Sequence, residues 1–341
     1  MLPMSNKLPT IKEIAQRLNI SVSTVSRALH EHPSIGLRTK MRVQQLAKEL
    51  NYEPNQTAIN FQQRKTFTLG VVLPDLSEAF FSSAINGIED VAYKNNYSVL
   101  LAQSHDDEEK EKKIFETMKK HRVDGVLVSI GKNVTNYDHY EMMKRYNIPV
   151  VFFDRIPKLP NIHYVAADMQ TGTKEAVDFL LKKGHRVIGM INGPETLLAS
   201  QDRLLGYITA MKKNRLKFDP SLIVSSNLTT ESTHDAIKEL LALKRKPTAI
   251  VTFNDYVALD AIRYAKKANL QINKDISFVS YANLPVIHYL ESTPLASVEQ
   301  YPNLQGQKAT EILLHLISDN KDEKESSYQK TIIESKLIIH R

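Results

Sequence analysis

The sequence predicts an α/β protein in which a small helical head precedes a two-lobed core of doubly wound parallel sheets. Two short amphipathic helices near the N-terminus form a helix-turn-helix pattern, and from Phe67 onward apolar, β-branched runs alternate with helical stretches. Positive charge is concentrated in residues 1–66, which hold ten Lys or Arg and four Glu. This excess of positive charge accounts for nearly all of the net charge of +7 of the whole chain. A basic head on a nearly neutral body is typical of a DNA-binding module joined to a second domain.

The composition of the 341 residues fits two or three soluble globular domains, with 42% hydrophobic and 24% charged residues. The absence of cysteine excludes disulfides and thiolate metal sites. No apolar run approaches the ~18 residues that span a bilayer, and the N-terminus lacks the apolar segment of a signal peptide. We therefore expect a cytoplasmic protein with no membrane partner.

The first two helices of the head are expected within Thr10–Leu29, with a turn at Asn19–Ser21. Thr10 followed by Glu13 three residues later predicts a capping box at the start of the first helix. The apolar residues of this helix recur at helical spacing: Ile11, Ile14, Ala15 and Leu18. Ser21 is expected to cap the second helix, whose apolar residues again fit one face: Val22, Val25, Ala28 and Leu29.

The outer face of the second helix carries small hydroxyls and one guanidinium. Such a face suits insertion into the major groove of DNA, although an ordinary helical hairpin would show the same periodicity. Arg27 is predicted to read a base, because an Arg can fork onto guanine O6 and N7, with Val22 and Ser23 beside it. Backbone or groove contacts are predicted for five other residues: Thr10, Ser21, Thr24, Ser26 and Asn55.

A third helix, expected over Leu37–Leu50, completes a small head core. Its core candidates are Met41, Val43, Leu46, Ala47 and Leu50. The polar stretch Asn55–Lys65 contains no glycine and fits either a short helix or a linker. It is too short to be stable alone, so a helix here would need to pack against something else.

The core is predicted from two series of alternating strands and helices, each giving a parallel sheet with helices on both faces. The strands are expected at Phe67–Leu73, Tyr97–Ala102, Val123–Val128, Pro149–Phe153, Val187–Asn192, Ile223–Ser226, Ala249–Phe253 and Ile276–Tyr281. The helices are expected at Ala79–Lys94, Glu108–His121, Tyr137–Tyr146, Met169–Lys183, Arg203–Asn214, Ser232–Leu243 and Val257–Ala268. A last helix near Leu304–Ile317 and a last strand near Thr331–Ile339 follow.

A ligand is expected where the carboxyl ends of the two parallel sheets face one cleft. The residues that follow the predicted strands include carboxylates, a guanidinium, amides and aromatic rings, which together suit a polyhydroxylated ligand. The candidates are Phe80, Phe81, Ser129, Asp154, Arg203, Asn254, Asp255, Tyr281 and Asn283. An Asp at the end of a strand can also simply cap the next helix, which is the alternative for Asp255.

Two stretches of the head carry a specific resemblance. They read T-I-K-E-I-A-Q-R-L-N-I-S-V-S-T-V-S-R-A-L over Thr10–Leu29 and L-N-Y-E-P-N over Leu50–Asn55. The chain resembles the LacI/GalR family of bacterial transcription regulators over nearly its whole length. This implies a head at 1–54, a hinge helix at 55–66 and a periplasmic-binding-protein-like core at 67–341. The first lobe would be about 67–162 plus 294–320, and the second about 163–293 plus 328–341.

The resemblance also implies a homodimeric repressor that binds a pseudo-palindromic operator. Its affinity for DNA would change when a small effector binds, and the expected effector is a sugar or sugar derivative. In the family the hinge inserts a side chain into the minor groove, and the matching residue is Phe61. The core segments F-F-D-R at Phe152–Arg155, R-L-L-G-Y at Arg203–Tyr207 and F-N-D at Phe253–Asp255 resemble effector-binding segments. The segment S-V-E-Q at Ser297–Gln300 resembles the strand that crosses between the lobes in the family. This resemblance adds Gln300 to the candidate effector-binding residues.

One departure from the family bears on the effector. The usual G-[F/Y]-D-[D/N] after the last strand of the second lobe reads S-Y-A-N here, so Ala282 puts a methyl group where a carboxylate is expected. The effector is therefore predicted not to be a simple neutral hexose bound as in the best-known members. A sugar acid, a phosphorylated sugar and the end of an oligosaccharide stay open.

Other function classes have less support. No two glycines are separated by a single residue, so the chain has no G-x-G-x-x-G, and it contains neither H-E-x-x-H nor G-x-S-x-G. We therefore expect no catalysis, no cofactor and no metal. The main alternative is a two-lobed solute-binding protein for carbohydrate uptake, but that class would need a signal peptide and no basic head.

Overall fold

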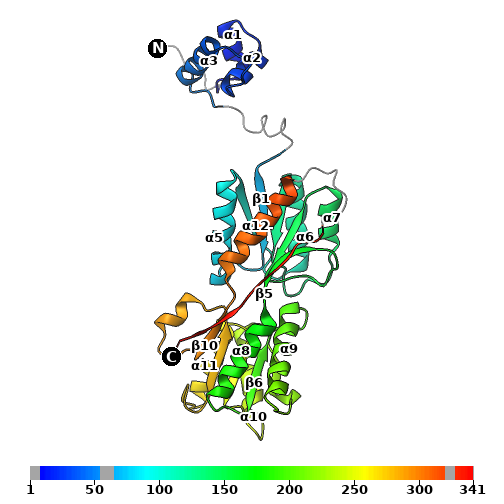
Figure 1. The fold of residues 1–341 in the computed structure, drawn as a ribbon, viewed down its shortest axis with the longest axis vertical. Helices are drawn as coiled ribbons and strands as arrows, with labels where there is room; N and C mark the ends of the chain where they lie inside the picture. The colour runs from blue at the N-terminus through cyan, green and yellow to red at the C-terminus, as the bar shows by residue number, and fades with distance from the viewer. Residues whose placement is uncertain (1–7, 54–64, 319–326, 341) are drawn as a thin grey trace. The chain divides into compact units, whose positions relative to one another are not determined.

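The computed structural model describes residues 8–53, 65–318 and 327–340 (Figure 1). The chain divides into two compact units, Met1–Thr66 and Phe67–Arg341. Asn55, Phe61 and most of the expected hinge lie outside the described residues. No helix in the described part of the chain is long and apolar enough to cross a membrane.

The head consists of α1 (Ile11–Leu18), α2 (Val22–Leu29) and α3 (Leu37–Glu49). The Thr10 hydroxyl accepts a hydrogen bond from the Glu13 amide at 3.3 Å, so the predicted cap is present. The Glu13 carboxylate binds Arg17 at 2.7 Å, so it does not close the reciprocal half of a capping box. Asn19 ends α1 in the left-handed conformation with φ of 51°.

The small core of the head is formed by one apolar face of each of the three helices. Its buried side chains are Ile14, Ala15, Val25, Ala28, Val43 and Ala47. The prediction that Met41 is a core residue is wrong, since 60% of its surface is exposed. Met41 lies two positions before Val43, which places it about 200° around α3. Val22 is also 41% exposed, so it does not share the buried face of Val25.

The core contains two six-stranded sheets. In spatial order the first sheet contains β11 (Lys330–Ile333), β5 (His163–Ala167), β4 (Val150–Phe153), β3 (Gly125–Val128), β1 (Thr68–Leu73) and β2 (Ser98–Gln103), all parallel. The second contains β12 (Lys336–Ile339), β10 (Ala296–Glu299), β9 (Ser277–Tyr281), β8 (Ala249–Thr252), β6 (Ile188–Asn192) and β7 (Ile223–Ser225). Within it only β12 is antiparallel to its neighbour.

Helices cover both faces of each sheet. The first lobe carries α5 (Ala79–Lys94), α6 (Glu108–Lys120), α7 (Asp138–Arg145) and α12 (Pro302–Ser318). The second carries α8 (Met169–Lys182), α9 (Leu198–Lys213), α10 (Thr230–Ala242) and α11 (Asp255–Lys267), with short 3-10 turns at Pro220–Leu222 and Pro285–Tyr289. Successive side chains of β1 point to opposite faces. Val71 therefore packs in the cluster of α5 and α12, and Val72 in that of α6 and α7.

The chain crosses between the lobes differently from the expectation. The predicted last strand Thr331–Ile339 is two short strands, β11 and β12, which belong to different sheets. β5 lies in the first sheet and β10 in the second, so the expected lobe boundaries at 162/163 and 293/294 are each displaced by one strand. An apolar strand just before a crossing has the same pattern as one just after it, and the sequence therefore does not decide between the two sheets.

Two glycines let α5 and α12 pack closely, and Figure 1 shows these helices side by side. A Cβ atom on Gly87 would lie 2.0 Å from the Asn303 carbonyl oxygen, and one on Gly306 would lie 2.2 Å from that of Ala84. Gly87→Ala is therefore expected to lower the free energy of unfolding by about 1–3 kcal/mol, because the helices must separate. Chemical denaturation measures this.

The control for this substitution is Glu89→Ala, on the exposed face of the same helix. It is expected to change the free energy of unfolding by less than about 0.5 kcal/mol. Increased stability of the Gly87→Ala variant, as helix propensity alone would predict, would contradict the proposed close packing.

Candidate functional site

The first candidate surface is the outer face of α2. The Ser21 hydroxyl accepts from the Thr24 amide at 3.0 Å and lies 2.8 Å from the hydroxyls of Ser23 and Thr24, which caps the helix and orders this face. Ser23 and Arg27 are exposed, whereas Thr24 and Ser26 are half-buried. Within the described residues no carboxylate lies within ion-pair distance of Arg27, so its guanidinium is available to a phosphate or a base.

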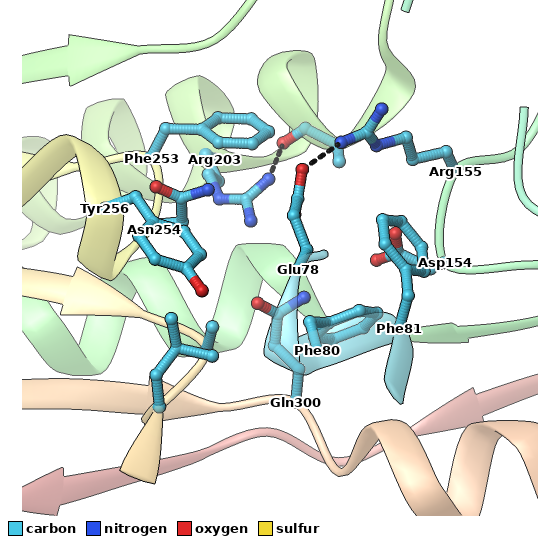
Figure 2. A pocket seen from close by; sticks show the side chains of 13 residues that line it. Glu78, Phe80, Phe81, Asp154, Arg155, Arg203, Phe253, Asn254, Tyr256 and Gln300 are labelled. Carbon is cyan, nitrogen blue, oxygen red and sulfur yellow. Dashed lines mark hydrogen bonds and ion pairs between the residues drawn. The ribbon is translucent and has the colours of Figure 1, made fainter. Parts of the chain in front are cut away.

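The second candidate site is a pocket between the two lobes, with a volume of about 480 Å³ that includes space open to solvent (Figure 2). The first lobe contributes Glu78, Phe80, Phe81, Asp154 and Arg155, and the second contributes Ala199, Arg203, Phe253, Asn254, Tyr256, Ala282, Leu284 and Gln300. Most of these residues follow the carboxyl ends of strands β1, β4, β8 and β9 or begin the next helix. This is the place where open parallel sheets bind ligands.

Arg203 is a deeply buried cation in the wall of this pocket. Only 3% of it is exposed, and its guanidinium carbon lies 4.1 Å from the ring centroid of Phe253 and 4.3 Å from that of Tyr281. Its Nη1 donates to the Ala199 carbonyl oxygen at 3.2 Å, and its Nε has no hydrogen-bond partner in the described residues. Burial lowers the pKa of Arg203, opposed by the charge of Asp154. Within the described residues one donor of this cation, the buried Nε, is therefore left without an acceptor.

The opposite wall carries the carboxylate of Asp154, which follows β4 in the left-handed conformation with φ of 58°. Its Oδ2 accepts only a long hydrogen bond, 3.5 Å from the Ser129 hydroxyl. Burial raises the pKa of Asp154, opposed by the charges of Arg155 and Arg203. Beside it, the Arg155 guanidinium lies 3.0 Å from Asp106 Oδ1. This wall therefore offers a poorly satisfied acceptor.

The pocket brings together most of the predicted effector residues. They are Phe80, Phe81, Asp154, Arg203, Asn254 and Gln300. The predicted residues Ser129, Asp255, Tyr281 and Asn283 are not among its lining residues. Ser129 contacts Asp154, Tyr281 lies against Arg203, and Asn283 donates to Glu299 at 2.8 Å in a neighbouring pocket.

Asp255 has a supporting place in the structure. It is fully buried and accepts hydrogen bonds from the Ser280 hydroxyl, the Ser297 hydroxyl at 2.7 Å and the Leu284 amide at 2.6 Å. These bonds hold the loop that carries Ala282 and Leu284 into the pocket. The structure therefore places Asp255 behind the pocket wall. The capping alternative is wrong for Asp255, because the side chain that caps α11 is that of Asn254, which accepts from the Val257 amide at 2.9 Å.

Several lining residues were not selected from the sequence. They are Glu78, Arg155, Ala199, Tyr256 and Leu284. Arg155 directly follows Asp154 in the F-F-D-R segment, so that segment could have indicated it. Among the described residues no group of three His, Asp or Glu could hold a metal ion.

The geometry defines a class of protein: a two-lobed ligand-binding core that follows a helix-turn-helix head. Residues 66–341 match the family model of periplasmic binding proteins and the sugar binding domain of the LacI family, and residues 10–55 match that of bacterial regulatory proteins of the lacI family. The chain belongs to the LacI family of bacterial regulators. It is a DNA-binding transcriptional regulator whose activity is controlled by a small-molecule effector.

Named relatives are similar over most of their length. The transcriptional repressor CytR of Escherichia coli (strain K12) is 30% identical over 308 residues, which is 89% of both chains. The transcriptional repressor PurR of Aliivibrio salmonicida is 28% identical over 93% of this chain and 95% of its own. Both are repressors rather than enzymes.

Solved structures agree on the fold. The lac repressor dimer bound to operator and an anti-inducer has a TM-score of 0.82 at 23% identity, covering 97% of this chain and 98% of that one. The regulator CelR in complex with cellobiose has a TM-score of 0.73 at 24% identity with the same coverage. At these identities the likeness concerns the fold.

The supporting place of Asp255 predicts a stability effect. Asp255→Ala would leave three buried donors without their acceptor, and we expect it to lower the free energy of unfolding of the core by about 3 kcal/mol. Thermal melting and denaturant titration measure this. Asp235→Ala, on the exposed face of α10, is the matched control and is expected to have little effect. Equal stabilities for the two variants would show that Asp255 does not support the loop.

The raised pKa of Asp154 predicts a pH dependence. A carboxyl whose pKa is higher in the folded than in the unfolded protein binds its proton more tightly when folded, so its contribution to stability falls as the pH rises. We therefore expect Asp154→Asn to raise the melting temperature relative to wild type, and to do so more at pH 7.5 than at pH 5. A gain that is larger at pH 5 would contradict the raised pKa.

Proposed function

We propose that this protein acts in the cytoplasm as a homodimeric repressor that binds a pseudo-palindromic operator. We further propose that a polyhydroxylated effector, a sugar or sugar derivative, binds between the lobes and alters the affinity for DNA. The observation that carries the proposal is the pocket, whose walls bring together the Arg203 guanidinium of one lobe and the poorly satisfied acceptor Asp154 of the other.

The DNA-binding role is assigned to the exposed face of α2. Arg27 is the proposed base-reading residue. Val22 and Ser23, at the exposed start of the same helix, are proposed to contact the DNA beside it. Small hydroxyls allow the helix backbone to approach the groove closely, and they can bind phosphates. Thr10, Ser21, Thr24 and Ser26 are the proposed hydroxyls for these contacts. Asn55 and the minor-groove wedge Phe61 are proposed on the resemblance alone.

The effector role is assigned to both walls of the pocket. A hydroxyl group can accept from Arg203 and donate to Asp154, while Phe80 and Phe81 cover the apolar face of a sugar ring. Because these side chains come from two lobes, a bound ligand fixes the angle between them. Such a change is typical of hinge-type switching, with a coupling free energy of about 1–3 kcal/mol.

The proposed roles of the head predict different effects of two substitutions. Arg27→Ala is expected to weaken binding by about 1–3 kcal/mol at one operator position and to relax the preference there. Lys65→Ala, which removes a charge near the start of the core, is expected to weaken all DNA about equally and to reduce the salt dependence. Fluorescence anisotropy with DNA from upstream of the gene, scanned over single-base variants and salt, measures both.

The same assay tests the effector. Ribose, cellobiose and other sugars are titrated into the protein–DNA complex, and a change in operator affinity is expected with at least one of them.

Equal loss of affinity for every DNA sequence in Arg27→Ala would remove this residue from base reading. A wild-type protein with no salt-sensitive, sequence-selective binding to any upstream fragment would overturn the proposal.

A further inference from the structure

The pocket contains a carboxylate, that of Glu78, with no evident structural role. Glu78 is the residue immediately before α5, where a negative charge is favourable because of the helix dipole. Its side chain makes no capping hydrogen bond. In the view of Figure 2 it extends from the start of α5 into the space between Arg203 and Arg155. The carboxylate is therefore directed into the pocket.

The contacts of Glu78 leave most of its acceptor capacity unused. A carboxylate offers about four lone-pair sites. Among the described residues the only polar contact of the Glu78 carboxylate is the Arg155 guanidinium, at 3.6 Å, which is too long for a hydrogen bond. Arg155 already has a closer partner in Asp106, at 3.0 Å, so Glu78 is not needed to hold it.

Glu78 is accessible as well as under-satisfied. The exposed fraction of its side chain is 29%, against 8% for Arg155. Burial raises the pKa of Glu78, and the nearby charges of Asp154, Asp106 and Asp75 add to this, whereas Arg155 opposes it. Burial and the neighbouring carboxylates therefore disfavour the charged form of Glu78 in the ligand-free protein.

The charges around the pocket bear on the ligand. Glu78 and Asp154 face it as carboxylates, Arg155 is engaged by Asp106, and Arg203 is the remaining cation in the wall. Beyond them Ala282, Leu284 and Phe80 form an apolar wall. An anionic group would meet two carboxylates and the single guanidinium of Arg203, whereas a hydroxyl group can donate to a carboxylate and accept from the guanidinium.

We infer that Glu78 is a specificity-determining residue that accepts hydrogen bonds from hydroxyl groups of the effector, and that the effector is a neutral polyhydroxylated molecule. This inference rests on the proposed function and deepens it. It also narrows the ligands left open by Ala282, since it disfavours a sugar acid and a phosphorylated sugar and favours the neutral end of an oligosaccharide or a similar molecule.

The test uses matched pairs of neutral and anionic ligands on the full-length protein. The pairs are ribose and ribose 5-phosphate, glucose and glucose 6-phosphate, cellobiose and cellobionate, and adenosine and adenosine 5′-monophosphate. Binding is measured by calorimetry and by the change in operator affinity. We expect the neutral member of at least one pair to bind, with its anionic partner at least tenfold weaker.

The variant is Glu78→Gln, and Glu89→Gln makes the same chemical change on the exposed face of α5. A hydrogen bond to a charged group contributes enough for Glu78→Gln to weaken the neutral ligand by about tenfold or more, whereas Glu89→Gln should not change its affinity. We also expect Glu78→Gln to melt at the same temperature as wild type or higher. A merely structural carboxylate would give a lower melting temperature.

Three results would overturn the inference: unchanged affinity of Glu78→Gln for the neutral ligand, tighter binding of the anionic member by wild type, or a loss of thermal stability in Glu78→Gln without a loss of ligand affinity. Wild type that binds no member of any pair would instead contradict the polyhydroxylated effector of the proposed function. Failure of Glu78 in its role and failure of the function are thus distinguishable.

Discussion

The ligand site is organised by the burial of one cation, Arg203, for which the described part of the chain provides no carboxylate at ion-pair distance. Arg203 is held between the rings of Phe253 and Tyr281, which stabilise its charge through their π faces. The Phe253 ring needs Gly193 beside it, because a Cβ atom there would lie 2.4 Å from a ring carbon. The Tyr281 hydroxyl is bound by Thr173. The supporting residues therefore fix the direction of the donors that Arg203 presents to the pocket.

The fold was largely predictable because most helices and strands carry their own periodicity, although β5 (His163–Ala167) was not among the predicted strands. α5 lies at the predicted residues Ala79–Lys94, bounded by a polar loop and by Asn95 and Asn96. α9 begins at Leu198 rather than at Arg203, because the apolar Leu197 and Leu198 give no clear start signal. Arg203 therefore lies in the second turn. The sheet to which β5 and β10 belong depends on where the chain crosses between the lobes, and this is a tertiary property.

The site was only partly predictable, for a related reason. Polar residues after strands can be read from the sequence, and Asp154 and Asn254 do line the pocket, as does Arg203 from within α9. Asp255 follows a strand equally well, but its side chain turns inward to three donors. Glu78 is one of many acidic residues near the start of a helix, and only the structure shows that its carboxylate is directed into the pocket. Side-chain direction after a strand is set by packing rather than by sequence position.

The three crossings of the backbone between the lobes have a mechanical consequence. The chain passes from one sheet to the other between β5 and α8, between β10 and α12, and between β11 and β12. Three covalent crossings restrain the separation of the lobes more than a single linker would, because each crossing segment can span only a limited distance. A single proteolytic cut in one crossing would also leave the two lobes joined.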